Sequence, residues 1–280
     1  MSNIFSCKTN EAYYIKILAE LLSNNLKIGA FEINKNGIIL KMFDHHRKTL
    51  VDLQMFSENF SIYKFKSNEK IFMGLNLNHF NKMLKSIKKK DSLQLYIEED
   101  NIQDLCIKTI PKENKSSSTS SIKIQKIQNI DIDTPTGYGK PIIIQSSEFQ
   151  KMCKDLSMIG SSNIKIVFKN NIIEFIADSD GILKRKVVFG ENIEEDDDDD
   201  DDDENEKKEY VATFSTDQIS RISKLSGLSN NMYLYTISSN LPLLFSTNIG
   251  LLGKISIFIK SNELIENENK NFNEVFSDSD

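Results

Sequence analysis

Residues Ser146–Gly160, SSEFQKMCKDLSMIG, decide the fold, because one helical pattern gives this stretch a buried face and a charged face. Four apolar residues recur at i, i+3, i+4 and i+7 and so predict a face packed on a core: Phe149, Met152, Cys153 and Leu156. At roughly 100° per residue, Lys151 and Lys154 project from the opposite side. Ser146 or Ser147 offers an N-cap, and the closing glycine offers a left-handed stop.

The same pattern recurs three more times along the chain. The further apolar stripes are Tyr14, Ile17, Leu18 and Leu21, then Phe80, Met83, Leu84 and Ile87, then Ile219 and Ile222. The bases opposite these stripes are Lys16, then Lys82 and Lys85, then Arg221 and Lys224. The stripes begin at positions 14, 80, 149 and 219, which are 66, 69 and 70 residues apart. One helix per roughly 70 residues indicates an internal repeat.

Two interpretations of these bases are open. Any surface helix turns lysines toward water, so one such helix alone carries no function. Four helices in register favour a second interpretation, in which the bases form a continuous positive surface suited to phosphates.

The formal charge of −6 conceals a strong local asymmetry. Twelve acids lie between Glu194 and Glu206, and without them the remaining chain carries +6. A run of this kind cannot bury a core, and we expect a solvated loop. A calcium site is the alternative, although the run lacks the glycine turn of a defined calcium loop.

The three cysteines, Cys7, Cys106 and Cys153, are widely spaced and include no CxxC pair. This usage favours a reducing compartment. No N-terminal signal peptide and no bilayer-length apolar run is evident, so we expect a soluble intracellular protein that makes no membrane contact. No cofactor or metal site is expected.

The remaining segments predict an α+β fold with two similar halves, each a pair of helix-plus-sheet half-repeats. The expected strands are residues 27–33, 37–43, 49–55, 61–65, 70–75, 92–98, 104–110, 122–125, 141–145, 163–168, 172–178, 183–189, 209–214, 231–237, 241–246 and 254–259. Asn34–Gly37 predicts a tight turn, and Asn78 is a possible cap of the second helix. The expected domains are residues 1–126 and 140–261, joined by a connector at 127–139 and followed by a disordered acidic tail at 262–280.

Several blocks resemble the proliferating cell nuclear antigen family of eukaryotic and viral DNA sliding clamps. SSEFQKMCKDLSMIG followed by NIIEFIADSDG resembles the start of that family's second domain, and MGLNLNHFNKMLKSI resembles its second helix region. GIILKMFDHHRKTLVDLQM resembles the first-domain hairpin, and LPLLFSTNIGLLGKI the closing hairpin. The resemblance runs from about Tyr13 to Lys260 with the blocks in the same order.

The resemblance implies the DNA-clamp fold, with three chains closed head to tail into a ring, sheets outside and helices lining a hole for duplex DNA. The bases implied to line that hole are Lys16, Lys82, Lys85, Lys151, Lys154, Arg221 and Lys224. Their contacts are expected to be with phosphates, without sequence preference. Ala19 stands where a second base would be expected in the first helix.

The resemblance also implies a partner pocket beneath the connector, which accepts a short peptide with aromatic anchors. The matching positions are Phe43, Leu50, Ile130, Ile132, Pro242, Ile257 and Phe258. Ordinary core burial is the alternative for Phe43 and Leu50, whereas the connector isoleucines are harder to assign to a core. The connector IDIDTPTG and the last strand ISIFIKS, which lacks a tyrosine pair, depart from the family's pattern.

Ring closure in this family pairs two edge strands, which correspond here to about Ser121–Lys126 and Leu183–Phe189. The interface residues are Ile122, Ile124, Leu183, Lys184, Lys186 and Val188. An uncovered edge invites pairing with another chain. The implied partners are double-stranded DNA, DNA polymerase and other PIP-box proteins, a clamp loader, and two further copies of the chain, in a nucleus or in a cytoplasmic viral factory.

Three other functions remain open at this level. The chain could be one subunit of a heterotrimeric ring, or a processivity factor that works as a monomer. Asp44-His45-His46 also spells the DHH of a class of metal phosphoesterases, which use a two-metal site. That site needs further Asp or His ligands, and His79 is the only other histidine.

Overall fold

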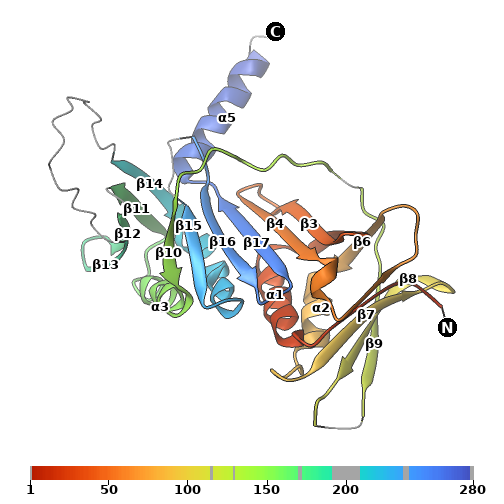
Figure 1. Cartoon of the computed structure of the whole chain (residues 1–280). Coiled ribbons are helices and arrows are strands. Elements are labelled where there is room, and N and C mark those ends of the chain that lie inside the picture. Colours follow the sequence, from red (N-terminus) through yellow and green to blue (C-terminus); the bar gives the residue numbers. More distant parts are fainter. Residues whose placement is uncertain are drawn as a thin grey trace, which may run out of the picture. The chain divides into compact units, whose positions relative to one another are not determined.

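The computed structural model describes residues 2–113, 116–128, 130–169, 172–190, 209–235 and 240–277 (Figure 1). Two compact units make up the chain. Unit 1 comprises Met1–Thr134, Lys224–Asn230 and Ser246–Ile257, and unit 2 comprises Pro135–Ser223, Asn231–Phe245 and Phe258–Asp280. The acidic run from Glu194 to Glu206 lies outside the described residues.

Unit 1 contains two helices and two antiparallel sheets. Its elements are β1 (Asn3–Thr9), α1 (Ala12–Asn25), β2 (Ile28–Asn34), β3 (Gly37–Phe43), β4 (Thr49–Phe56), η1 (Ser57–Asn59), β5 (Ile62–Phe65), β6 (Ile71–Asn76), α2 (Leu77–Leu84), β7 (Ser92–Glu98), β8 (Asn101–Ile110) and β9 (Ser118–Lys123). One sheet has the order β5-β1-β7-β8-β9. The other has the order β17-β4-β3-β2-β6, where β17 (Gly253–Ile259) contributes its first residues to this unit.

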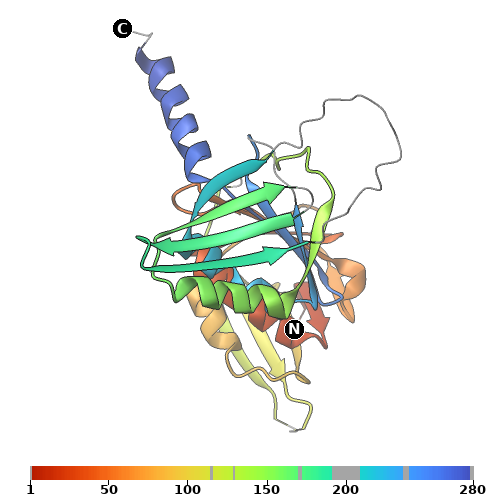
Figure 2. The ribbon, with the colours of Figure 1, turned by 90° about the vertical axis from the view of Figure 1, so that its left-hand side faces the viewer.

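Unit 2 repeats this plan. Its elements are β10 (Pro141–Gln145), α3 (Ser146–Ser157), β11 (Asn163–Lys169), β12 (Ile172–Ser179), β13 (Leu183–Phe189), β14 (Tyr210–Ser215), α4 (Thr216–Arg221), β15 (Asn231–Tyr235), the start of β16 (Leu243–Ile249) and α5 (Asn262–Ser277). The short helix η2 (Ser223–Gly227) follows α4. The sheets have the orders β13-β12-β11-β14 and β10-β15-β16. In Figure 2, α3 lies beside the strands of the first of these sheets.

The helices are positioned by their apolar stripes. All four stripe residues of α3 are buried, and the ring of Phe149 packs against Phe245 at a centroid distance of 5.4 Å. In α2 the stripe is buried except for Met83, which is 40% exposed and corrects the predicted face. In unit 1, α1 packs against α2, and in unit 2, α3 packs against α4.

The hairpin turn after β2 forms where the sequence predicts it. Gly37 has φ +146°, and a Cβ there would lie 1.9 Å from the carbonyl oxygen of Met55. Tyr63 locks the turn from β5, because its hydroxyl donates to the carbonyls of Asn34 (2.6 Å) and Gly37 (2.8 Å). This turn fixes the β2–β3 register.

Several predicted boundaries are corrected. β1 was not expected, the cap of α2 is Asn76 instead of Asn78, and the N-cap of α3 is Gln145 instead of a serine. The strand predicted at 122–125 is β9, which begins at Ser118, and the fourth helix is a short α4 followed by η2. The thiols of Cys7, Cys106 and Cys153 are free. No helix among the described residues is long and apolar enough to cross a membrane.

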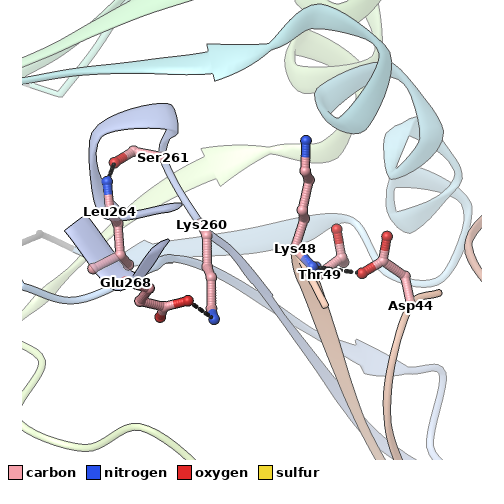
Figure 3. A network of polar contacts seen from close by, with 7 residues as sticks. All are labelled: Asp44, Lys48, Thr49, Lys260, Ser261, Leu264 and Glu268. Carbon is pink, nitrogen blue, oxygen red and sulfur yellow. Dashed lines mark hydrogen bonds and ion pairs between the residues drawn. The ribbon is translucent and has the colours of Figure 1, made fainter. Parts of the chain in front are cut away.

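The predicted disorder from residue 262 is wrong for α5, which is anchored at its first turn. The Ser261 hydroxyl accepts from the Leu264 amide at 3.1 Å, and the Lys260 ammonium pairs with Glu268 at 2.6 Å (Figure 3). Both oxygens of Glu263 lie 3.0 Å from the Thr213 amide nitrogen on the edge strand β14. The helix therefore covers a backbone donor that the edge strand would leave exposed.

The Glu263 anchor predicts a pH-dependent contact. Partial burial opposes ionisation, but the Thr213 amide and nearby hydrogen bonds outweigh it and hold the pKa of Glu263 below its ordinary value. A lowered folded-state pKa means that the contact stabilises above the ordinary pKa and is lost as pH falls through the folded value. We expect the Thr213 amide NMR shift to titrate below the pKa of an ordinary glutamate. In the Glu263→Gln variant we expect the Thr213 amide shift not to change over this pH range. If the variant titrates like the wild type, the assignment to Glu263 is wrong.

Candidate functional site

In unit 1 the predicted bases Lys82 and Lys85 project into solvent from α2. Both are exposed, and no carboxylate among the described residues lies within ion-pair distance of either. The helix that carries them is fixed by its buried stripe and by the Asn76 cap, whose side chain accepts from the His79 amide at 3.0 Å. These two charges are available to a ligand.

Lys16 on α1 has a different environment. Its ammonium donates to the carbonyls of Lys85 at 2.7 Å and Ile87 at 2.9 Å, and it lies 5.8 Å from the ring centroid of Tyr13. Lysine at a helix C-terminus satisfies carbonyls that have no partner within the helix. Lys16 therefore joins α1 to the end of α2. Its ammonium group already has partners within unit 1 and is less available to a ligand than Lys82 and Lys85.

In unit 2 the equivalent pair is Lys151 and Lys154 on α3. Both are exposed, and the described residues place no carboxylate within ion-pair distance of them. Arg221 on α4 is also exposed but pairs with Asp217 one turn earlier. The structure thus leaves α2 and α3 with matching pairs of lysines, 69 residues apart in the sequence.

Lys224, in the η2 segment that belongs to unit 1, is engaged as well. Its ammonium lies 2.9 Å from Glu20 on α1, and both side chains are partly exposed. A pair of this kind contributes roughly 0–1 kcal/mol and exchanges readily with water. Lys224 is therefore less available than the lysines of α2 and α3.

Unit 1 also contains a hollow of about 380 Å³ beside the connector. It is lined by Ala30, Glu32, Ile39, Lys41, Met42, Phe43, Arg47, Ile127, Gln128, Ile130, Asp131 and Ile132. Three of the predicted pocket residues, Phe43, Ile130 and Ile132, lie here, and Ile130 is 70% exposed. Leu50 does not line the hollow: it is 2% exposed, so the core interpretation holds for it.

The turn between β3 and β4 shapes one rim of this hollow. A side-chain oxygen of Asp44 accepts from the amides of Lys48 (2.7 Å) and Thr49 (2.9 Å), as Figure 3 shows. Arg47 adopts φ +55° within this turn, and its guanidinium lies 5.1 Å from the ring centroid of Phe43. The Asp44 bonds hold the turn that places a cation over the apolar wall.

This geometry gives Asp44 a structural role, in contrast to the phosphoesterase alternative. Asp44 is buried, with its bonds directed to the backbone, whereas His45 and His46 are exposed. Within the described part of the chain, no group of three or more His, Cys, Asp and Glu side chains is placed to hold a metal.

The predicted C-terminal wall is buried. Ile257 and Phe258 are core residues, and Pro242 is buried in unit 2, where its carbonyl accepts from the Tyr138 hydroxyl at 2.8 Å. The Tyr138 ring also packs against Tyr235 and Phe258, with centroids 6.1 and 6.0 Å away. Tyr138 anchors the end of the connector to its own unit.

Both predicted interface strands lie at sheet edges. β9 ends the order β5-β1-β7-β8-β9, with Ile122 buried and Ile124 half-buried just beyond the strand. β13 ends the order β13-β12-β11-β14. Leu183, Lys184 and Val188 of β13 are exposed, and Lys186 pairs with Glu174 on β12. These edges present backbone groups that a further strand can pair with.

Two residues of these surfaces escaped prediction. Arg47 directly follows Asp44-His45-His46 in the sequence. Its guanidinium reaches the Phe43 ring because Arg47 has a positive φ, which nothing in the sequence indicates. Tyr138 lies between two glycines of the connector. A single aromatic residue in such a segment was the only sequence feature that could have indicated its anchoring role.

Family models match nearly the whole chain. The model of the N-terminal domain of proliferating cell nuclear antigen matches residues 4–135, and the model of its C-terminal domain matches residues 131–262. Together they cover residues 4–262, which include the connector and most of both units.

Known proteins match over a similar length. A probable DNA polymerase sliding clamp 1 from Paramecium bursaria Chlorella virus 1 is 24% identical over 262 residues, covering 91% of this chain and 96% of that protein. A DNA polymerase sliding clamp from Nitrosopumilus maritimus is 24% identical over 261 residues, covering 91% and 97%. The crystal structure of proliferating cellular nuclear antigen from Entamoeba histolytica has a TM-score of 0.78 at 20% identity, covering 93% of this chain and 100% of that one.

Proposed function

Because the chain belongs to the proliferating cell nuclear antigen family, whose members are DNA sliding clamps and not enzymes, we propose that three copies close into a ring around duplex DNA. The observation that carries the clamp function is the match of both family domains across residues 4–262. A ring of this kind tethers a polymerase and so makes synthesis processive. The phosphoesterase alternative is set aside.

The DNA-binding role rests on the matched lysine pairs. Lys82, Lys85, Lys151 and Lys154 are exposed and without a carboxylate partner among the described residues, so they can exchange counterions for phosphates. Lys16, Arg221 and Lys224 have partners within the chain and act as secondary contributors. Contacts to phosphates alone carry no sequence information, which suits a body that slides.

The partner-binding role rests on the hollow beside the connector. Its apolar wall, Phe43 with Ile130 and Ile132, suits a peptide with apolar and aromatic anchors, as in the PIP-box segments of polymerases and repair proteins. Arg47 adds a cation at the rim. We infer that replication and repair proteins dock here, and that a clamp loader opens the ring.

Replacing Ile130 with asparagine tests the hollow. Ile130 is largely exposed, so the change leaves the fold intact but removes an apolar contact of roughly 1.5–3 kcal/mol. We expect a labelled PIP-box peptide to bind about tenfold or more weakly by fluorescence anisotropy. Ile102→Asn is the control, because Ile102 is 61% exposed on β8 and does not line the hollow. Equal affinity for the Ile130 variant and the wild type excludes the assignment.

Primer extension with a polymerase and light scattering of the purified chain test the proposal as a whole. Longer products and a mass of three 32.1 kDa chains support it. A stable single chain that still lengthens products favours a monomeric processivity factor, and a chain that requires a different subunit favours a heterotrimeric ring. The clamp acts where DNA is replicated, in a nucleus or at a viral replication site.

A further inference from the structure

The loop between α2 and β7 carries three consecutive lysines that the proposed DNA surface does not include. Lys88, Lys89 and Lys90 are exposed, and they follow α2 by only three residues. No carboxylate among the described residues lies within ion-pair distance of them. With Lys82 and Lys85 they concentrate five cations within nine residues.

The backbone of this loop is held in place. Asp91 is buried, its carboxylate accepts from the Lys88 amide at 2.8 Å, and its own amide donates to the Lys88 carbonyl at 3.1 Å. The Lys16 ammonium fixes the preceding Ile87 carbonyl at 2.9 Å. Asp91 therefore bonds to the loop backbone and not to the lysine ammonium groups, and the backbone that carries these lysines is held in place.

Tyr13 locates this loop beside the first turn of α1. The ammonium groups of Lys16 and Lys89 both lie 5.8 Å from its ring centroid. The loop therefore adjoins both helices of unit 1, on the side where α2 ends.

A purely structural role does not account for these charges. Cations near a helix C-terminus are stabilised by the helix dipole and by unpaired carbonyls. Lys16 already occupies the carbonyls of Lys85 and Ile87, which lie just beyond the last residue of α2. Three further adjacent cations add mutual repulsion unless a polyanion offsets it.

We propose that the Lys88–Lys90 loop binds nucleic-acid phosphates and extends the DNA contact of Lys82 and Lys85 beyond the end of α2. The inference rests on the proposed clamp function and adds a contact to it. The ligand is the sugar-phosphate backbone of a duplex, because exposed ammonium groups on the flexible stems of lysine side chains match spaced phosphates without reading bases.

The test compares two double variants of the full-length chain. Lys88→Gln/Lys90→Gln removes two loop charges and keeps Lys89 on Tyr13. Lys35→Gln/Lys64→Gln removes two exposed lysines from the β2–β3 turn and from β5 in the same unit. Affinity for a short fluorescent duplex of mixed sequence is measured between 50 and 200 mM salt. Each lost phosphate contact lowers the slope of log K against log salt by about 0.9.

We expect the loop variant to lose roughly 1.8 units of slope, so that its affinity falls about tenfold less than the wild type's over that salt range. The Lys35/Lys64 variant keeps the wild-type slope. If the loop variant has the same salt slope as the wild type, the inference is wrong. This holds even if the variant stimulates a polymerase less, because the loop would then contact a protein partner and not DNA. The variant Lys82→Gln/Lys85→Gln distinguishes a failure of the loop proposal from a failure of the proposed clamp function. If this variant also has the wild-type slope, the proposed DNA contact of α2 is itself wrong.

Discussion

Glutamate in place of Lys82, Lys85, Lys151 and Lys154 is expected to abolish the stimulation of a DNA polymerase on a primed circular template. These lysines are exposed and without a carboxylate partner among the described residues, so each reversal turns attraction for a phosphate into repulsion. None of them supports the core, because the buried faces of α2 and α3 lie opposite. Product length on denaturing gels is the measurement.

A control with the same charge change separates this effect from net acidity. Lys35, Lys64, Lys140 and Lys254 are exposed, lie outside α2 and α3, and come from both units. Their fourfold replacement by glutamate is expected to leave stimulation near the wild-type level, with unchanged thermal unfolding in both variants. Full stimulation by the helix variant would remove these lysines from the DNA contact.

The helical faces were largely predictable from the sequence. In α3 the whole apolar stripe is buried, because the spacing i, i+3, i+4 and i+7 spans a narrow arc of the helix. Met83 of α2 follows the same spacing but is 40% exposed. At 100° per residue it lies about 60° from Phe80, at the margin of the stripe, where the neighbouring elements decide burial.

The state of each charge was not predictable. Lys16 and Lys82 occupy equivalent places in the repeat, yet Lys16 binds carbonyls 69 and 71 residues away. Lys224 meets Glu20 only because the chain folds back on α1. Periodicity assigns a residue to a face, and tertiary contacts assign its partner.

The candidate pocket and α5 show the same limit. Ile130 and Ile132 could be predicted as pocket residues, because apolar side chains in a polar connector have no core of their own to pack into. Composition predicted disorder from residue 262, but local anchors override it: Ser261 caps α5 and Glu263 holds the edge of β14. Anchors between distant segments leave no local pattern in the sequence.

The proposed ring closure through β9 and β13 predicts the other large effect, a change of assembly. Just beyond β9, the Ile124 amide bonds to Gln103 of β8, whereas the Gln125 amide points the other way, to Gly74. Backbone direction alternates along a strand, so the Ser121 amide faces the open edge. Ser121→Pro therefore removes an outward donor and keeps the β8 ladder.

In the sheet that contains β13, the matched pair is Val188 on the edge strand β13 and Val211 on the opposite edge strand β14. Val188 pairs with Glu174, Glu174 with Val167, and Val167 with Val211, so one row on one face links the two edges of the sheet. The two valines are 46% and 45% exposed. Lysine at either position leaves a single chain folded, but only lysine at Val188 puts an unpaired charge into the proposed interface.

Light scattering measures the molecular mass of each variant and so shows whether the three-chain assembly forms. An uncompensated buried charge costs about 3 kcal/mol or more, which weakens each interface by more than a hundredfold. We expect Val188→Lys and Ser121→Pro to shift the mass from three chains toward one chain of 32.1 kDa, and Val211→Lys to stay at three. A trimer that survives both edge variants would place closure elsewhere. Dissociation by Val211→Lys would point to the opposite edge, at β14, where Glu263 already occupies the Thr213 amide.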